Sequence, residues 1–162
     1  MDFYLEKLNI NHTQMEFDCG DEAINAFFER SLDEVLLNNS QVYVLTRNNK
    51  MIGFFALTMS SIRAIINGKD LKHPVCLLCQ LGINLPFQDK GYGSYLIEQA
   101  IEKALKISNE IGCKGIVVDT YNKNQIENFY GKQGFIKLDE LKQRDGRIKY
   151  ILFYQFEKFV KY

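Results

Sequence analysis

The chain has 162 residues, with 20 basic and 20 acidic side chains, so its formal net charge at pH 7 is zero. Hydrophobic residues make up 46% of it, which excludes an intrinsically disordered chain. The length predicts one domain over residues 1–162. A zero net charge excludes a protein that coats nucleic acid by bulk charge alone.

The charges are unevenly distributed along the chain. Residues 1–36 hold nine acidic and two basic side chains, whereas residues 37–162 hold eleven acidic and eighteen basic ones. This distribution predicts an acidic N-terminal section joined to a basic body. Such a division can set the sign of a binding face, or it can reflect a solvated acidic helix.

The N-terminus and the cysteines indicate a cytoplasmic protein. The start of the chain, MDFYLEKLN, is charged and has no apolar core of a secretory signal, and no window approaches the roughly 20 apolar residues of a membrane span. Cys76 and Cys79 form a CxxC within an apolar run, where an offset of three places their side chains on opposite faces of a strand. We therefore expect reduced core cysteines and no metal site.

The first part of the chain predicts a strand, a helical stretch and a hairpin. Residues 3–9 form a short strand, and a helical stretch opens at Asp18 or Gly20. Its apolar residues recur at helical steps: Ile24, Phe27, Phe28, Leu32, Val35 and Leu36. The runs 41–47 and 51–62 are strand-like, and the residues between them, Asn48, Asn49 and Lys50, are typical of a tight antiparallel turn.

The remainder predicts a β-α-β unit followed by a short helix and two strands. A polar connection with a turn at Asn67-Gly68 leads to an apolar run over 75–85, and a long helix then extends to about Ile111, before Gly112. The expected inner face of this helix is Ile97, Ile101, Ala104, Leu105, Ser108 and Ile111. A strand at 115–121, a helix near 124–132 and strands at 134–138 and 147–156 follow. The order predicts an α+β fold with a central parallel β-α-β crossover in a sheet whose ends are antiparallel.

The segment from Gln88 to Ser94 has the composition of a phosphate-binding turn. It joins a strand that ends near Asn84 to the long helix, and it contains Gly91 and Gly93. Glycines at such a turn let backbone N–H groups point outward, and the helix start adds partial positive charge. Lys90 supplies a further cation, while neither the Walker nor the Rossmann pattern fits.

A second segment, Asn128 to Phe135, makes this turn more specific. Together the two segments resemble the GNAT superfamily of acetyl-CoA-dependent N-acetyltransferases. The first matches the superfamily's Q/R-x-x-G-x-G/A coenzyme loop, and the second matches its F-Y-x-x-x-G-F element. The resemblance covers residues 75 to 160 closely. It implies a GNAT-like twisted mixed sheet of about six or seven strands with helices on both faces.

The resemblance also implies roles for particular residues. Leu81, Gly82 and Ile83 would pair with the pantetheine arm of acetyl-CoA. The pyrophosphate would be held by the backbone amides of Gln88, Asp89, Lys90, Gly91, Tyr92, Gly93 and Ser94. The superfamily often has Asn where this chain has Lys123, so the neighbouring Asn124 is the candidate for that coenzyme contact.

Tyr130 matches the tyrosine that the superfamily commonly uses as the acid beside the thioester sulfur. A phenol with a pKa near 10 can protonate the leaving thiolate when an amine attacks the acetyl carbon. A core aromatic residue is the competing interpretation. No general base is assigned: we expect His12 and His73 to make surface or capping contacts, and Asp119 to be a strand-end residue at least as readily as a base.

The acceptor amine is left open between several classes. The run 17–20, Phe-Asp-Cys-Gly, and the strands after it are similar to the toxin-type branch of the superfamily, which acetylates aminoacyl-tRNA and is neutralised by a small DNA-binding antitoxin. The basic body, which contains the coenzyme loop and Tyr130, favours RNA weakly, while the acidic section favours a cationic amine or a peptide N-terminus. Taken as a whole, the charge division favours a cationic amine over RNA. The sequence also leaves open a non-catalytic acyl-CoA sensor, a nucleotide-binding regulator, and a homodimer formed through the C-terminal strand.

Overall fold

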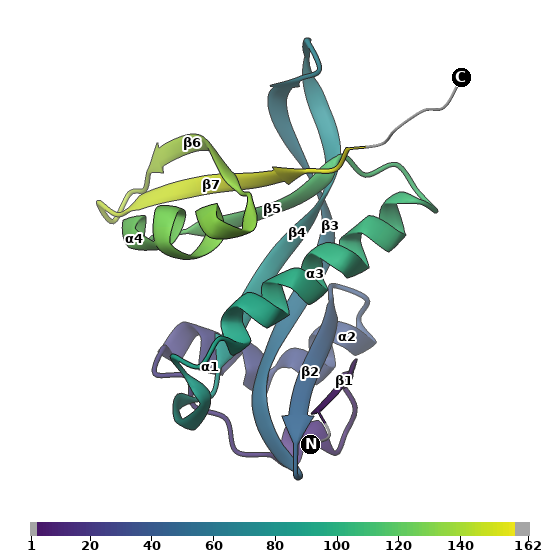
Figure 1. Cartoon of the computed structure of the whole chain (residues 1–162), viewed down its shortest axis with the longest axis vertical. Helices are drawn as coiled ribbons and strands as arrows, with labels where there is room; N and C mark the ends of the chain where they lie inside the picture. The colour runs from purple at the N-terminus through teal and green to yellow at the C-terminus, as the bar shows by residue number, and fades with distance from the viewer. Residues whose placement is uncertain (1–2, 158–162) are drawn as a thin grey trace. The chain divides into compact units, whose positions relative to one another are not determined.

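Within residues 3–157, which the computed structural model describes, seven strands hydrogen-bond in the order β1-β2-β3-β4-β5-β7-β6 (Figure 1). The strands are β1 (Phe3–Lys7), β2 (Gln41–Arg47), β3 (Lys50–Ile66), β4 (Lys69–Ile83), β5 (Gly115–Thr120), β6 (Ile136–Lys142) and β7 (Ile148–Gln155). The helices are α1 (Glu22–Glu29), α2 (Ser31–Leu36), α3 (Tyr92–Ser108) and α4 (Lys123–Gln125). This arrangement confirms the predicted α+β class.

The chain forms two compact units, which are described separately. Unit 1 consists of Met1–Thr58 and Leu78–Ala100, and unit 2 of Met59–Leu77 and Ile101–Tyr162. Strands β3 and β4 and helix α3 each contribute to both. A single domain over the whole chain stays a prediction.

In unit 1, the aromatic residues of α1 pack against the inner face of the antiparallel pair β2 and β3. Phe27 and Phe28 of α1 contact Phe54 of β3, with ring centroids 6.1 and 5.2 Å apart. The same cluster contains Val42, Val44, Met51 and Ala56, all almost fully buried. Alternation along the strands selects these residues, because neighbouring side chains point to opposite faces.

Helix α1 begins one to three residues later than the sequence indicated. Asp21, rather than Asp18 or Gly20, is its N-cap: the Asp21 carboxylate accepts hydrogen bonds from the N–H groups of Ala23 and Ile24 at 2.9 and 3.2 Å. The predicted helical stretch forms two helices, α1 and α2, which are divided at Arg30, in agreement with an order that has two helices before the hairpin. Leu36 at the end of α2 is 70% exposed, so it lies outside the core.

The predicted hairpin between β2 and β3 is confirmed. Asn48 and Asn49 both have left-handed backbone angles, with φ of 52° and 60°. Asparagine tolerates this region better than most residues, and two such residues in succession match the twist of the paired strands.

The polar connection predicted before residue 75 is a β-ribbon instead. Strand β3 extends to Ile66, Asn67 and Gly68 form a tight turn with φ of 52° and 76°, and β4 begins at Lys69. In unit 2, Ile66 and Val75 of this ribbon pack with Val117 of β5 and Phe153 of β7. A ribbon with mostly polar, exposed side chains has the composition of a loop, which explains the wrong prediction.

The C-terminal strands of unit 2 are antiparallel, as predicted. Strand β7 pairs with β5, where Val117 lies opposite Phe153, and on its other edge with β6. Cys113 lies next to Cys76, with the two Sγ atoms 3.7 Å apart, and both are free and buried thiols. Burial raises the pKa of Cys76 to about 12, so this thiol stays protonated, as expected of a core cysteine.

Helix α3 is shorter than predicted, and two residues of its expected inner face are exposed. It ends at Ser108, whose hydroxyl donates to the carbonyl of Leu105 at 2.6 Å. Leu105 and Ile111 are 40% and 60% exposed. The fully buried apolar side of the helix is formed by Leu96, Ile97, Ala100 and Ala104. Among the described residues, none of the helices combines the length and the hydropathy of a membrane span.

Replacing Gly82 of β4 with alanine is expected to destabilise the protein by about 1–3 kcal/mol, because the core has no room for a methyl group there. A Cβ atom at this position would lie 2.7 Å from Ile24 Cγ2 and 3.0 Å from Phe17 Cζ. Chemical denaturation measures the change. At Gly112 the nearest atom to an added Cβ is 3.9 Å away, so Gly112→Ala should stay within about 0.5 kcal/mol. Equal effects of the two changes would contradict this account.

Candidate active site

The carboxyl end of β4, where the pantetheine arm was expected, is anchored by Asn84. The Asn84 side-chain amide donates to the carbonyls of Met51 and Glu16 at 2.9 and 3.2 Å, and its oxygen accepts from the N–H of Asp18 at 3.1 Å. Its own N–H donates to the carbonyl of Ile52 at 2.8 Å. One side chain therefore joins β3, the end of β4 and the segment before α1.

The three residues expected to pair with pantetheine immediately precede this anchor. Gly82 is buried, while Leu81 and Ile83 are half-buried. Gly53 of β3 lies beside them: a Cβ at Gly53 would be 2.6 Å from the carbonyl oxygen of Gly82. The two glycines thus allow a close approach of backbones, which fixes the position of this strand end.

The side chain of Gln88 connects the predicted coenzyme loop to the rest of unit 1. Its Nε2 donates to the carbonyls of Ile83 and Cys19 at 2.9 and 2.8 Å. The backbone N–H of Gln88 already donates to Leu85 at 3.3 Å, so that amide is engaged within the loop. Gln88 therefore fixes the loop through its side chain, and the residues after it present the free amides.

The loop then turns into α3 through two left-handed residues. Asp89 has φ of 59° and Gly91 has φ of 88°. The carbonyl of Gly91 accepts from the N–H of Tyr95 at 3.2 Å, which makes Gly91 the residue that opens the helix. The first backbone N–H groups of a helix have no partner within it, so those of Tyr92, Gly93 and Ser94 are suited to an anion. Lys90 is exposed beside them.

Tyr130, in unit 2, is buried at the end of a π-helical turn, Ile126–Tyr130. It is 7% exposed and packs edge-on against Phe129 and Phe135, with ring centroids 4.8 and 5.6 Å away. Burial raises the pKa of Tyr130 to about 12, because the phenolate would lose its hydration. The phenol therefore keeps its proton throughout the physiological pH range.

Asn124 lies on the same helical segment as Tyr130. It lines a cavity of about 300 Å³ together with Lys123, Asn128, Lys137 and other residues of unit 2. The neighbouring Asn122 is engaged locally, since its side chain accepts from the N–H of Asn124 at 3.0 Å. Of the two asparagines, both exposed, only Asn124 is among the residues that line this cavity.

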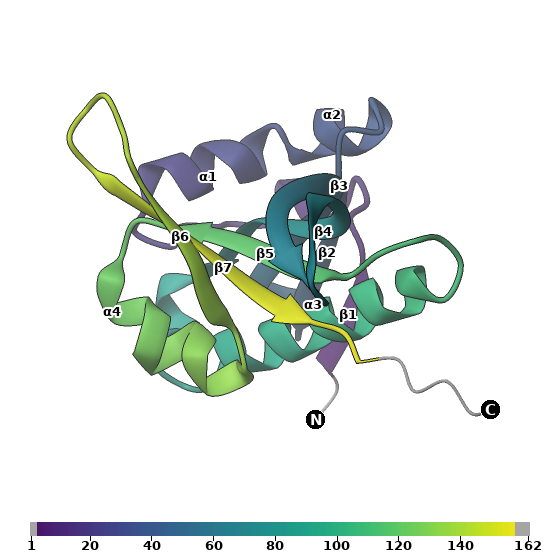
Figure 2. The ribbon, with the colours of Figure 1, turned by 90° about the horizontal axis from the view of Figure 1, so that it is seen from above.

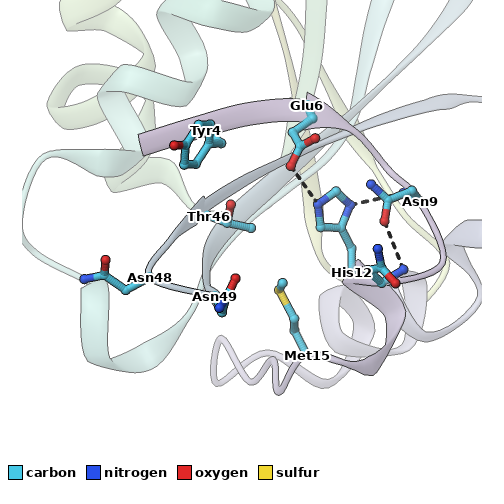
Figure 3. A pocket seen from close by; sticks show the side chains of 9 residues that line it. Tyr4, Glu6, Asn9, His12, Met15, Thr46, Asn48 and Asn49 are labelled. Carbon is cyan, nitrogen blue, oxygen red and sulfur yellow. Dashed lines mark hydrogen bonds and ion pairs between the residues drawn. The ribbon is translucent and has the colours of Figure 1, made fainter. Parts of the chain in front are cut away.

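Both histidines have structural contacts, but neither is on the surface. His12 is 2% exposed; its Nδ1 accepts from the N–H of Asn9 at 3.1 Å and its Nε2 lies 3.5 Å from Glu6 (Figure 3). His73 is also 2% exposed, with Nε2 3.0 Å from the carbonyls of Ala64 and Lys69. The expectation of surface contacts is therefore wrong. The contact between His12 and Asn9 is a turn contact, since the short helix that begins at His12 has no side-chain cap.

The pocket that contains His12 includes none of the predicted coenzyme-binding residues. It has a volume of about 380 Å³, and its lining includes Tyr4, Asn48 and Asn49 (Figure 3). Asp119, the other candidate base, is in β5 of unit 2 with one carboxylate oxygen 3.8 Å from Lys149 Nζ. This ion pair agrees with a structural role for Asp119.

The structure brings the predicted residues together in two groups. Unit 1 holds Leu81–Ile83 and the loop 88–94, and unit 2 holds Asn124 and Tyr130. Sequence reasoning missed Asn84 as the anchor of the first group. A polar residue at the end of an apolar run, just before Leu85-Pro86, is the only local signal that could have indicated it.

Comparison with known proteins identifies the family. Residues 38–137 match the acetyltransferase (GNAT) domain. A tRNA-acetylating toxin of Mycobacterium tuberculosis is 28% identical over 63% of this chain, and the chain spans just under two thirds, 66%, of that protein. A probable toxin TacT of Sinorhizobium fredii is 24% identical to this chain. The match covers 71% of this chain and 70% of the length of that toxin.

A solved structure agrees with these matches over almost the whole chain. It is that of a tyrosine-to-phenylalanine mutant of the toxin AtaT, bound to the C-terminus of the antitoxin AtaR and acetyl-CoA. The TM-score between the two structures is 0.73 and the sequence identity is 25%. The match covers 96% of this chain and 94% of the AtaT chain.

We expect Gln88→Glu to lower both the melting temperature and the affinity for acetyl-CoA. The new carboxylate would face the carbonyls of Cys19 and Ile83, which the amide now bonds, so repulsion replaces two hydrogen bonds. Thermal unfolding and calorimetric titration with acetyl-CoA measure the two effects. Gln99→Glu in α3 is the matched change of charge. If both variants bind acetyl-CoA as the unmodified protein does, Gln88 does not fix the loop.

Taken together, the match over residues 38–137, the fold and the two curated relatives show that the chain belongs to the GNAT acetyltransferase family, as an acetyl-CoA-dependent acyltransferase.

Proposed function

We propose that the protein transfers the acetyl group of acetyl-CoA to the α-amino group of an aminoacyl-tRNA. The observation that carries this choice of acceptor is the similarity to the mycobacterial tRNA-acetylating toxin. The run Phe-Asp-Cys-Gly at 17–20 supports it, because this run is similar to the toxin-type branch of the superfamily.

The charges of the two units are consistent with an RNA acceptor. The ranges of unit 1 carry five basic and eleven acidic residues, and those of unit 2 carry fifteen basic and nine acidic ones. A net positive charge on one unit attracts RNA phosphates, even though the whole chain is neutral.

In the proposed reaction, the amine nitrogen attacks the acetyl carbon and the carbon–sulfur bond breaks. Tyr130 donates its phenolic proton to the departing sulfur and is reprotonated from solvent. A free α-amino group has a pKa of about 8, so roughly a tenth of it is already neutral and able to attack at pH 7. Water is therefore a sufficient acceptor for the amine's proton, and neither histidine is needed as a base.

The residues of unit 1 bind and orient the donor in this proposal. Leu81, Gly82 and Ile83 offer backbone groups to the pantetheine arm, and the N–H groups at the start of α3 hold the pyrophosphate with help from Lys90. Asn124 of unit 2 makes a further coenzyme contact. The open space beside the Asn124 side chain supports that last assignment.

Further parts of the proposal concern location and partners. We place the protein in the cytoplasm as one domain, where charged tRNA is present and a small DNA-binding antitoxin neutralises it. The antitoxin-bound structure of AtaT supports such a partner. A small cationic amine or a peptide N-terminus is the second candidate acceptor, which the net negative charge of unit 1 favours.

The purified protein is expected to release free coenzyme A thiol from acetyl-CoA when charged tRNA is supplied. Thiol release and the mass of the aminoacyl group, read by mass spectrometry after hydrolysis, measure the transfer. Deacylated tRNA is the control, since it lacks the amine. Transfer to polyamines or peptides without transfer to any charged tRNA would establish the second candidate, and saturable binding without transfer would indicate a sensor.

Tyr130→Phe should lower kcat about a hundredfold or more and leave the affinity for acetyl-CoA nearly unchanged, because only the proton donor is removed. Tyr154→Phe is the matched control: Tyr154 packs against Phe135, as Tyr130 does, with a centroid distance of 5.7 Å. An unchanged kcat in Tyr130→Phe would remove the acid assignment. In cells, induced expression should inhibit translation, and the Tyr130→Phe variant should not.

A further inference from the structure

Among the described residues of unit 2, several basic side chains lie close together in the sequence at the turn between β6 and β7. We define the basic hairpin as residues 141–149, the sequence LKQRDGRIK. It contains four basic residues and a single acidic one: Lys142, Arg144, Arg147 and Lys149, with Asp145. Figure 2 shows this turn at the tip of the two paired strands.

Hydrogen bonds give the basic hairpin a defined shape. The N–H of Gln143 donates to the carbonyl of Arg147 at 2.8 Å, and that of Gly146 donates to Gln143 at 3.0 Å. Asp145 accepts from the backbone N–H of Arg147 at 2.9 Å and from its Nε at 2.7 Å. Gly146 has φ of 88°, which the turn requires. The turn is thus fixed before any partner binds, which lowers the entropy lost on binding.

Within residues 3–157, two of the four basic side chains have no carboxylate partner. Arg147 pairs with Asp145, and Lys149 lies 3.8 Å from Asp119. Neither Lys142 nor Arg144 forms an ion pair with any residue of this described range, and both are exposed. These two cations are therefore available to an anionic partner.

An aromatic ring stands next to these cations. The Arg147 guanidinium lies over the ring of Tyr121, 4.1 Å from its centroid, and Tyr121 is 46% exposed. Tyr121 directly follows β5, so the ring and the hairpin come from neighbouring strands of unit 2. Exposed cations beside an aromatic face are typical of surfaces that contact the phosphates and unstacked bases of RNA.

Three other basic residues of the described part of unit 2 are paired with carboxylates. Arg63 in the β-ribbon lies 3.7 Å from Asp70, and Lys106 in α3 lies 3.8 Å from Glu102. Lys137 at the start of β6 is bonded to Glu140. The basic hairpin therefore differs from the rest of the described unit by combining available cations, a fixed turn and an aromatic ring.

We propose that the basic hairpin is a docking surface for the phosphate backbone of the RNA acceptor. This inference rests on the proposed function, and it goes further by assigning RNA affinity to Lys142 and Arg144. Each of the two cations contacts one phosphate and releases the counterions that were bound there. Arg147 and Tyr121 stack beside them on the adjacent nucleotides.

The test measures binding separately from catalysis. Fluorescence anisotropy with labelled deacylated tRNA gives the dissociation constant of the full chain between about 50 and 200 mM salt. Lys142→Glu and Arg144→Glu are each expected to weaken binding by roughly eightfold at 0.1 M salt and to reduce the salt slope by about one. With charged tRNA, the KM should rise by a similar factor while kcat stays the same, since neither Lys142 nor Arg144 has a part in the proposed chemical step.

Lys72→Glu is the matched control. Lys72 is an exposed residue of β4 in the same unit, so this variant has the same net charge as the hairpin variants. It should leave the salt slope unchanged. Circular dichroism and thermal unfolding establish that each variant is folded, as expected for changes at exposed positions. A charge-preserving Arg144→Lys variant should retain most of the affinity.

The outcomes separate this inference from the proposed function. The docking surface is wrong if the hairpin variants bind tRNA as tightly as the unmodified chain, or if Lys72→Glu weakens tRNA binding equally. A hairpin that binds an acidic protein segment instead of RNA would also leave the tRNA affinity of the variants unchanged. If the unmodified protein binds tRNA through the hairpin but acetylates no charged tRNA, the docking surface stands and the proposed function falls.

Discussion

The position of the predicted coenzyme site in unit 1 depends on the hydrogen bonds of one amide side chain, that of Asn84. Its three bonds to Met51, Glu16 and Asp18 determine where β4 stops and where the chain turns away. Gln88 then bonds back to the strand end and to the segment before α1. A half-buried amide is costly to leave unbonded, so these contacts hold the loop in one conformation. The free amides at the start of α3 are oriented as a consequence.

Local chemistry made much of this predictable. The turn at Asn48-Asn49 and the helix opening at Gly91 depend on backbone conformations that only a few residue types favour, and both appear where the sequence indicated. The buried strands of the core also follow directly from apolar runs. The β-ribbon could not be predicted in this way, since its charged and polar residues have the composition of a loop. Only the pairing of the two strands shows that it is a ribbon. Pairing between distant segments leaves little trace in such a sequence.

The burial of the two histidines was also unpredictable from the sequence, for a related reason. His12 and His73 are both buried, and backbone groups of nearby turns and strands bond one ring nitrogen of each, Nδ1 of His12 and Nε2 of His73. Nothing in the neighbouring sequence distinguishes such a histidine from an exposed one. Asn84 is comparable, because two of its partners precede it in the chain by more than sixty residues. By contrast, Tyr130 could be proposed as the acid because its whole motif, and not the residue alone, resembles the superfamily's pattern.

The charge division acquires a different meaning in the folded chain. Along the sequence, the coenzyme loop belongs to the basic body, but in the structure it lies in unit 1, which has more acidic than basic residues. In the proposed site, directed N–H groups and Lys90 hold the pyrophosphate, and these act at short range and do not need a net positive unit. The positive charge of unit 2 is then available for a second polyanion. An acetyltransferase whose acceptor is RNA has two polyanionic substrates, and separate sources of positive potential keep them from competing for one surface.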